Sequence, residues 1–331
     1  MRYPLLAAGL LSIGATAAAQ AEQPTLTVYT YDSFVSDWGP GPQITEAFEA
    51  ICDCRLDLRG TGDGAALLAQ LRLEGPRTDA DVVLGLDTNL MTRAKQTGLF
   101  APHGLEVPEF DMPVAWNDPV FLPYDWGYFA FVHDRDAVPE PPRSFEELIA
   151  SDLDIVIQDP RSSTPGLGLL MWVKAAYGDD AAAIWEGLAP RVLTVTGGWS
   201  EAYGLFLDGE ADMVLSYTTS PAFHLIAEED DSKAAAPFEE GHYMQVEVAG
   251  MVEGTDQPEL ARAFLEFMLT DDFQSVIPTT NWMYPAVVPQ GGLPDGFETL
   301  IEPETALLLA PEEADALRDQ ALDEWRDGLS R

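Results

Sequence analysis

The chain has 331 residues, of which 47% are hydrophobic and 10% aromatic, enough to fill the cores of about two domains. Its 56 acidic and 17 basic residues give a formal net charge of −39, which would repel phosphate backbones and anionic lipids. This charge argues against nucleic-acid binding and against binding to a membrane surface. The acidic residues are spread along the chain, which is typical of adaptation to salty surroundings.

The first 21 residues have the layout of an export signal. A short positive start, Met1-Arg2, is followed by small apolar residues over Leu5–Ala19, with small-x-small cleavage sites at Ala17–Ala19 and Ala19–Ala21. The apolar stretch is shorter than the ~20 residues that span a bilayer, and no later stretch is long enough either. We therefore expect a signal peptide at residues 1–21 and a soluble, exported mature chain without direct membrane insertion.

The two cysteines, Cys52 and Cys54, are too few for a disulfide scaffold or a four-ligand zinc site. In an oxidising compartment we favour a disulfide between them, acting as a structural clip in a very tight ring. A metal or redox pair is the alternative, but it lacks a nearby histidine.

The first part of the chain alternates strands and helices. The expected elements, in chain order, are a strand at Leu26–Tyr31, a helix at Ile44–Ile51, a strand at Cys54–Leu58, a helix at Ala65–Leu73, a strand at Asp81–Leu86 and a helix at Leu90–Thr97. This order predicts a parallel sheet with helices on both faces.

The second part continues the α/β pattern. The expected elements are a strand at Tyr124–His133, a helix starting at Ser144, a strand at Ile155–Gln158, a helix at Thr164–Tyr177, strands at Val192–Thr196, Met213–Tyr217 and Tyr243–Val248, and helices at Glu259–Leu269 and Pro311–Leu329. Two α/β lobes fit this order. The first comprises residues 22–123 and 243–279, the second residues 124–242 and 280–331, and the chain crosses between them near Tyr124–His133 and Tyr243–Val248.

Motifs of common catalytic sites do not occur in the sequence. It contains no G-x-S-x-G, H-E-x-x-H, Walker or G-x-G-x-x-G pattern, and its four histidines lack metal-ligand spacing. An exported two-lobe protein without a catalytic set points to the capture of a ligand in a cleft that closes about a hinge.

Several uncommon segments fall in loops after expected strands, where open α/β sheets bind ligands. They are Tyr29–Phe34, Asp63-Gly64, Gln158–Gly166, Gly198–Tyr203, Ser216–Pro221 and Asn281–Pro285. As an ordered set they closely resemble the periplasmic thiamine-binding proteins of bacterial ABC importers, and the likeness runs from Leu26 to Arg331.

The resemblance implies a class II two-lobe periplasmic binding-protein fold, with a central β-sheet flanked by helices in each lobe and the ligand in the interlobe cleft. It also implies a periplasmic, monomeric protein that is not an enzyme and needs no cofactor. Such a protein captures thiamine, together with its monophosphate and diphosphate, and delivers it to an ABC permease with a cytoplasmic ATPase.

Residue by residue, the resemblance implies ligand contacts at Asp63, Gly64, Ser163, Thr164, Trp199, Tyr217, Thr218, Thr219 and Ser220. Tyr31 and Trp282 also resemble pocket aromatics of that family. Trp199 follows two glycines, which predicts a loop rather than a packed face. Where the family often has a tyrosine after Ser-Pro-Ala, this chain has Phe223, which keeps a ring face but loses a phenol hydrogen bond.

These residue types suit the chemistry of thiamine. Aromatic faces attract a cationic thiazolium ring by ~0.5–2 kcal/mol per good contact. Asp63 can accept from the exocyclic amine, so we expect it at the positive or amine-bearing end. Ser163 and Thr164 precede Pro165 at a helix start, so we expect them at the hydroxyethyl or phosphate end, with Arg161 adding charge.

Two other classes of function stay open. The same fold could bind ferric iron or a polyamine, although Tyr217-Thr218-Thr219 lacks the adjacent tyrosine pair that ferric-ion binders use. An exported thiamine-processing enzyme would need a cysteine nucleophile in the cleft, and Cys52 and Cys54 lie away from the expected cleft loops.

Overall fold

The computed structural model describes residues 23–330, so the predicted signal peptide lies outside the described residues. The strands are β1 (Thr25–Thr30), β2 (Arg55–Gly60), β3 (Val82–Asp87), β4 (Phe121–Asp134), β5 (Ile155–Gln158), β6 (Val192–Thr196), β7 (Met213–Tyr217), β8 (Lys233–Ala235), β9 (His242–Met251), β10 (Tyr284–Pro285) and β11 (Ala306–Leu307). The helices are α1 (Asp32–Val35), α2 (Gly41–Cys52), α3 (Gly64–Glu74), α4 (Met91–Gln96), α5 (Phe145–Ala150), α6 (Thr164–Tyr177), α7 (Ala181–Leu188), α8 (Trp199–Leu207), α9 (Pro221–Ala227), α10 (Pro258–Phe267), α11 (Asp271–Gln274), α12 (Ile277–Thr280) and α13 (Pro311–Leu329).

The main strands form one path of hydrogen-bonded neighbours in the order β2-β1-β3-β9-β4-β7-β5-β6. The outer strands are parallel: β1 pairs in parallel with β2 and β3, as predicted, and β5 pairs in parallel with β6 and β7. The middle of the sheet, for which no strand direction was predicted, is antiparallel: β9 runs antiparallel to β3 and to β4, and β4 runs antiparallel to β7. The two middle strands carry the chain between the halves in opposite directions, which makes them antiparallel.

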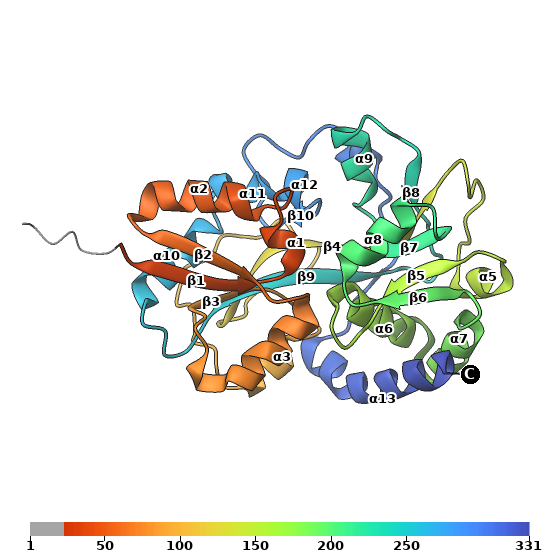
Figure 1. The fold of residues 1–331 in the computed structure, drawn as a ribbon, viewed down its shortest axis with the longest axis horizontal. Coiled ribbons are helices and arrows are strands. Elements are labelled where there is room, and N and C mark those ends of the chain that lie inside the picture. The colour runs from red at the N-terminus through yellow and green to blue at the C-terminus, as the bar shows by residue number, and fades with distance from the viewer. Residues whose placement is uncertain (1–22, 331) are drawn as a thin grey trace, which may run out of the picture.

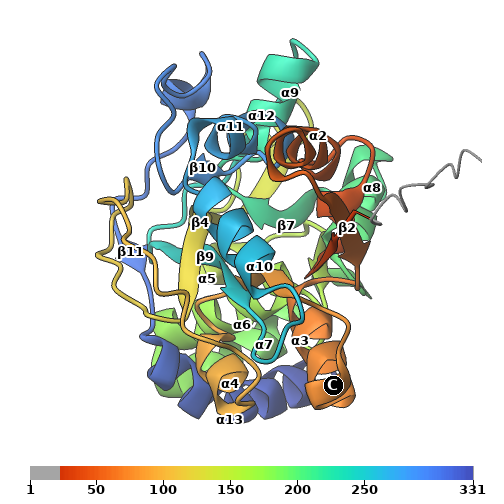
Figure 2. The same cartoon turned by 90° about the vertical axis from the view of Figure 1, so that its left-hand side faces the viewer.

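Figure 1 shows the two halves on either side of these long strands. The sheet of β1, β2 and β3 lies between α2 and α3, and the sheet of β5, β6 and β7 lies between α8 and the pair α6 and α7. Helix α13 packs against α6, α7 and α4, and Figure 2 shows α13 beside α4 at the base of the molecule. The expected two-lobe α/β architecture is confirmed, while the residue boundaries of the lobes stay predictions.

Local sequence signals explain several of these elements. Ser144 caps α5 by accepting a hydrogen bond from the Glu147 amide at 3.0 Å. Ser163 caps α6, and Pro165 lies in the first turn of that helix, where a missing N–H costs nothing. The cysteines form the disulfide that we favoured, at the end of α2 and just before β2. Within residues 23–330, we find no helix with the length and apolar character that crossing a membrane would require.

The contact between Gly168 in α6 and the buried ring of Phe129 in β4 leaves no room for a side chain. A Cβ atom at Gly168 would lie 2.0 Å from the Phe129 ring. We expect Gly168→Ala to lower the free energy of unfolding by ~1–3 kcal/mol, the usual cost of overpacking a core. Gly204 in α8 is a matched control, because a Cβ atom there meets nothing within 4 Å.

At Gly204 the same substitution should raise stability by ~0.5–1 kcal/mol, since alanine is the better helix former. Denaturant unfolding of both variants measures the two changes. If both variants changed the free energy of unfolding in the same direction, the Phe129 ring would move aside at little cost, and the contact at Gly168 would not exclude a side chain.

Candidate functional site

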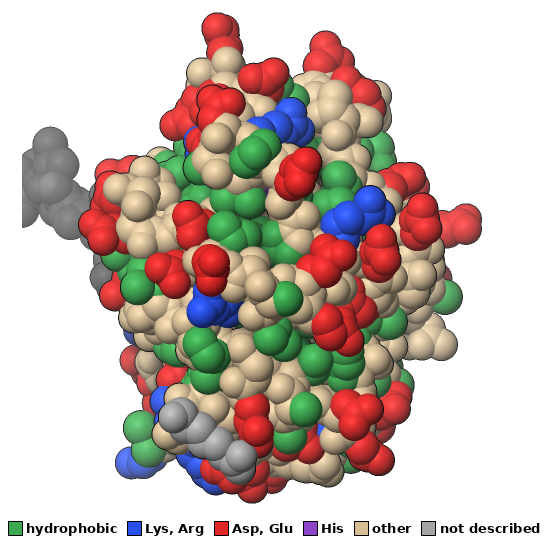
Figure 3. Space-filling view, turned by 90° about the vertical axis from the view of Figure 1, so that its right-hand side faces the viewer, with side chains coloured by type: hydrophobic (Ala, Val, Ile, Leu, Met, Phe, Trp, Pro, Cys, Tyr) green, Lys and Arg blue, Asp and Glu red, His purple; other side chains and the backbone are tan. Residues whose placement is uncertain are grey.

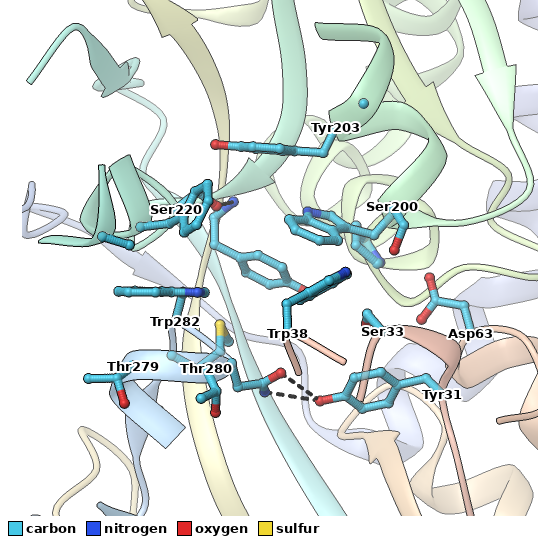
Figure 4. Close-up of a pocket in the computed structure, with 18 of the residues that line it drawn as sticks. Tyr31, Ser33, Trp38, Asp63, Ser200, Tyr203, Ser220, Thr279, Thr280 and Trp282 are labelled. Carbon is cyan, nitrogen blue, oxygen red and sulfur yellow. Dashed lines mark hydrogen bonds between the residues drawn. The ribbon is translucent and has the colours of Figure 1, made fainter. Parts of the chain in front are cut away.

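A cavity of about 580 Å³ lies where the two halves meet, within the size range of small-ligand sites. Seven aromatic side chains line it, namely Tyr31, Trp38, Trp199, Tyr203, Tyr217, Phe223 and Trp282. Two carboxylates, Asp63 and Glu247, and a set of polar side chains including Ser33, Ser200, Ser220 and Asn281 complete much of the wall. Figure 4 shows several of these groups, among them Tyr31, Trp38, Tyr203 and Trp282, facing one space from elements far apart in the sequence.

The aromatic wall on one side is built around Trp199. Its ring stacks on Tyr203 with centroids 4.9 Å apart and lies 6.2 Å from the ring of Trp38. The indole nitrogen Nε1 donates to Ser216 Oγ at 2.7 Å, which fixes the ring plane. Ser216 Oγ in turn contacts Ser220 Oγ at 2.7 Å, so the turn after β7 supports the tryptophan.

The structure corrects the prediction that Trp199 lies in a loop. Trp199 is the first residue of α8, and Gly198 is the extended N-cap residue before it. The two glycines therefore mark the entry to a helix, and the helical spacing of four residues is what stacks Trp199 on Tyr203.

A cluster of buried acids lies at one side of the cavity. Glu247 Oε2 accepts hydrogen bonds from the hydroxyls of Tyr31 at 3.0 Å and Tyr124 at 2.7 Å. Burial raises the pKa of Glu247 to about 7. Asp125 lies directly opposite Glu247 in the ladder of β4 and β9, and Asn281 Nδ2 donates to its Oδ2 at 2.6 Å. The pKa of Asp125 is raised well above its usual range. Burial is the largest cause, and the negative charge of Glu247 is the second.

The starts of α3 and α6 are in direct contact at the edge of the cavity. Ser163 Oγ donates to Asp63 Oδ2 at 2.8 Å, and the Gly64 amide donates to Thr164 Oγ1 at 3.2 Å. Asp63 and Ser163 therefore lie together. The expectation that they hold opposite ends of a ligand is wrong, because one hydrogen bond joins the two side chains. Arg161 is not directed there either, because it pairs with Asp159 and its guanidinium lies 5.5 Å over the ring of Trp325.

The structure brings together only part of the predicted set. Six of its residues line the cavity, namely Tyr31, Asp63, Trp199, Tyr217, Ser220 and Trp282. The other five lie behind or beside the lining, namely Gly64, Ser163, Thr164, Thr218 and Thr219, and all five are buried. Ligand contact by any of these eleven residues stays a prediction.

Several lining residues are absent from the predicted set. Trp38 is 54% exposed and lies four residues beyond Tyr29–Phe34, one of the segments that carry the resemblance, but it falls outside that segment. Phe223 was noted for its departure from the family, and its ring lies 5.4 Å from that of Trp282. Glu247 is one residue of a buried strand, and nothing local in the sequence marks it.

The cavity favours a flat cation on electrostatic grounds. None of its lining residues, all within the described 23–330, is lysine, arginine or histidine, whereas Asp63 and Glu247 are acidic. Acidic side chains also spread over the face of the molecule in Figure 3, where basic ones are few. Aromatic faces and carboxylates both attract positive charge, so the arrangement can hold a cationic ring.

Residues 39–275 match the family described as bacterial extracellular solute-binding protein. The chain belongs to this family. A curated solute-binding relative, the thiamine-binding periplasmic protein of Escherichia coli strain K12, is 54% identical over 93% of this chain and 94% of its own. The thiamine-binding periplasmic protein of Salmonella typhimurium is 53% identical over 95% of this chain and 96% of its own.

A solved structure supports the same comparison. It is titled periplasmic thiamin binding protein, is 52% identical, and matches 98% of this chain and 100% of its own with a TM-score of 0.91. The match therefore extends through both halves of this solute-binding protein.

Proposed function

We propose that this protein captures thiamine in the aromatic, acid-lined cavity and delivers it to an ABC importer. The observation that carries the proposal is the composition of the cavity wall, in which aromatic rings surround two carboxylates without a basic side chain among the described lining residues. Relatives at 54% and 53% identity are named for binding thiamine, which supports the same ligand here.

The chemistry of thiamine fits this wall. The thiazolium ring carries a permanent positive charge, and cation–π contacts contribute ~0.5–2 kcal/mol each. The flat aminopyrimidine can stack on a ring such as Trp199 or Trp282, and its amine can donate to a carboxylate. Glu247, which is fixed by two tyrosine hydroxyls, supplies negative charge for the cation.

The phosphate esters of thiamine belong to the same proposal. The helix starts at Asp63 and Ser163 meet at the cavity edge, and backbone N–H groups at helix N-termini favour anions. The hydroxyethyl arm, or a phosphate on it, would extend toward this point. We propose that the protein uses no cofactor, because the bound molecule is the cargo.

The family and the relatives support the proposed cellular setting. The proposed site of action is the periplasm, after removal of residues 1–21, and the proposed partners are a membrane permease and its cytoplasmic ATPase. The chain acts as a monomer and as a binding protein rather than an enzyme. Cys52 and Cys54 are joined in a disulfide and do not line the cavity, so neither provides a nucleophile there.

We expect calorimetric titration of the mature chain with thiamine to give saturable binding at one site. Choline, which carries a cation but no flat ring, should bind at least about fivefold more weakly, because stacking of a flat ring adds ~1–3 kcal/mol. Thiamine monophosphate and diphosphate are titrated in parallel. Spermidine and ferric citrate test the two rival ligands, and tighter binding of either one than of thiamine would overturn the proposal.

A further inference from the structure

Asp125 and Glu247 form a carboxylate pair on the two strands that connect the halves. They lie directly opposite each other in the antiparallel ladder of β4 and β9, so their side chains point to the same face of the sheet. Asp125 is fully buried and Glu247 is 5% exposed, yet Glu247 reaches the cavity wall. The pair therefore lies on the two strands that connect the halves and also reaches the ligand site.

The hydrogen bonds around the pair leave room for a proton. Glu247 Oε2 accepts from the hydroxyls of Tyr31 and Tyr124, and Asp125 Oδ2 accepts from Asn281 Nδ2. The other Asp125 oxygen, Oδ1, is buried and has no hydrogen-bond partner within residues 23–330. Asn281 Nδ2 also donates to the Tyr31 hydroxyl at 3.0 Å, which closes the network on the cavity side; dashed lines end at this hydroxyl in Figure 4.

No positive side chain of the described chain compensates the pair directly. The titratable groups that act on it are Tyr31 at the end of β1, Tyr124 on β4, Tyr217 on β7, Asp63 at the start of α3 and Asp87 at the end of β3. Arg318 on α13 acts on Asp87 rather than on the pair. Two like charges in such a buried place cannot both ionise easily, so the pair titrates as one unit.

We propose that Asp125 and Glu247 share one proton in the free protein and that a bound thiamine cation drives this proton into solvent. The inference rests on the proposed function and adds a proton link to it. The cation replaces the proton as the positive charge beside the pair, so the second carboxylate ionises at a lower pH when the ligand is present. Burial raises the pKa of Glu247 to about 7, which puts this exchange near neutral pH.

The direction of the pH effect follows from the proton count. Above the free-state pKa of Glu247 the proton is already lost, and the affinity for thiamine is constant with pH. Below it, binding must expel the proton, so the affinity falls as the pH falls, by at most about tenfold per pH unit for one proton. The fall ends at the lower pKa that Glu247 has in the complex.

The test is titration calorimetry with thiamine in two buffers of different ionisation heat, at about pH 6 and about pH 8.5, on either side of the titration. At the lower pH we expect the observed heat to depend on the buffer, corresponding to the release of up to one proton. At the higher pH the two buffers should give the same heat. The aminopyrimidine of thiamine takes up protons of its own in acid, so the release is counted as the difference between wild type and Glu247→Gln.

Variants separate the pair from its neighbours. Glu247→Gln should abolish the proton release and make the affinity for thiamine equal at the two pH values within about twofold. Asp125→Asn leaves Glu247 without the carboxylate opposite it that shares the proton, so it should reduce the release at the lower pH. Asp81→Asn is the control: Asp81 is another buried carboxylate, which accepts from the Thr27 amide, does not line the cavity and is not among the groups that act on the pair, so the release should persist.

Two failures are distinguishable. If thiamine saturates the wild-type protein with equal heats in both buffers at both pH values, the proton link is overturned and the proposed function stands. Undiminished release in Glu247→Gln would also overturn it. If thiamine does not saturate the folded protein at either pH, the proposed function is overturned, and this inference with it.

Discussion

Replacing Trp199 by alanine should weaken thiamine binding by ~1–3 kcal/mol, about five- to 150-fold in the dissociation constant. The ring supplies a face of the cavity, and its position is fixed from two sides, by stacking on Tyr203 and by the bond from Nε1 to Ser216. Truncation removes that face and leaves Ser216 Oγ without its donor. Titration of wild type and variant side by side measures the loss.

Two further variants identify the cause of that loss. Trp199→Phe keeps a stacking face but removes the indole N–H, so it should lose less affinity than alanine. Trp126→Phe makes the same change at a tryptophan that stacks on Tyr284 and does not line the cavity, so it should bind thiamine as wild type does. Equal dissociation constants for wild type and Trp199→Ala would remove this ring from the site.

Many helices and strands could be predicted from the sequence, because the signals that begin and end them lie within a few residues. The bounds of β5, β6, β7, α6 and α13 were predicted correctly from apolar runs, cap residues and prolines. The parallel sheet predicted for the first part is confirmed for β1, β2 and β3, but the antiparallel middle was not predicted, because the direction of β4 relative to β9 depends on where the chain crosses between the halves. Hydrophobic periodicity within a strand carries no information on that direction.

The residues of the candidate site also fall into two groups: those that local sequence marks and those that only contacts between distant segments reveal. Trp199 and Asp63 stand in segments with unusual composition, so the sequence marks them. Glu247 is recognisable only through its neighbours, because its role depends on Asp125 lying opposite in another strand and on two tyrosine hydroxyls from distant segments. The predicted positions of Asp63 and Ser163 at opposite ends failed for a related reason: the two helix starts approach each other only in three dimensions.

The meeting of these helix starts leads to a prediction on the phosphate esters. In the structure the anion at the starts of α3 and α6 is Asp63 itself, which accepts from the Gly64 amide at 2.9 Å and from Ser163 Oγ at 2.8 Å. Burial raises the pKa of Asp63, which reflects the cost of holding this charge in the interior. A phosphate arriving here would compete with the carboxylate for the same donors.

We therefore expect Asp63→Asn to weaken thiamine binding but to raise the affinity for thiamine monophosphate relative to thiamine, by about fivefold or more. The reason is that the substitution removes a negative charge within a few ångströms of the phosphate, a change of ~1 kcal/mol or more near a protein surface. The ratio of the two dissociation constants, measured by titration, is insensitive to any loss of stability that affects both ligands equally.

The double variant Ser163→Ala with Thr164→Val should act in the opposite sense. Both hydroxyls join the two helix starts, so both ligands should lose affinity, but the monophosphate should lose more, because bonds to a charged group contribute ~1.5–3 kcal/mol. Ser162→Ala is the matched control in the same turn, since Ser162 Oγ donates to the Gly197 carbonyl at 2.7 Å rather than to Asp63. If the double variant lost both ligands equally and Asp63→Asn left the ratio unchanged, the phosphate would have to bind away from these helix starts.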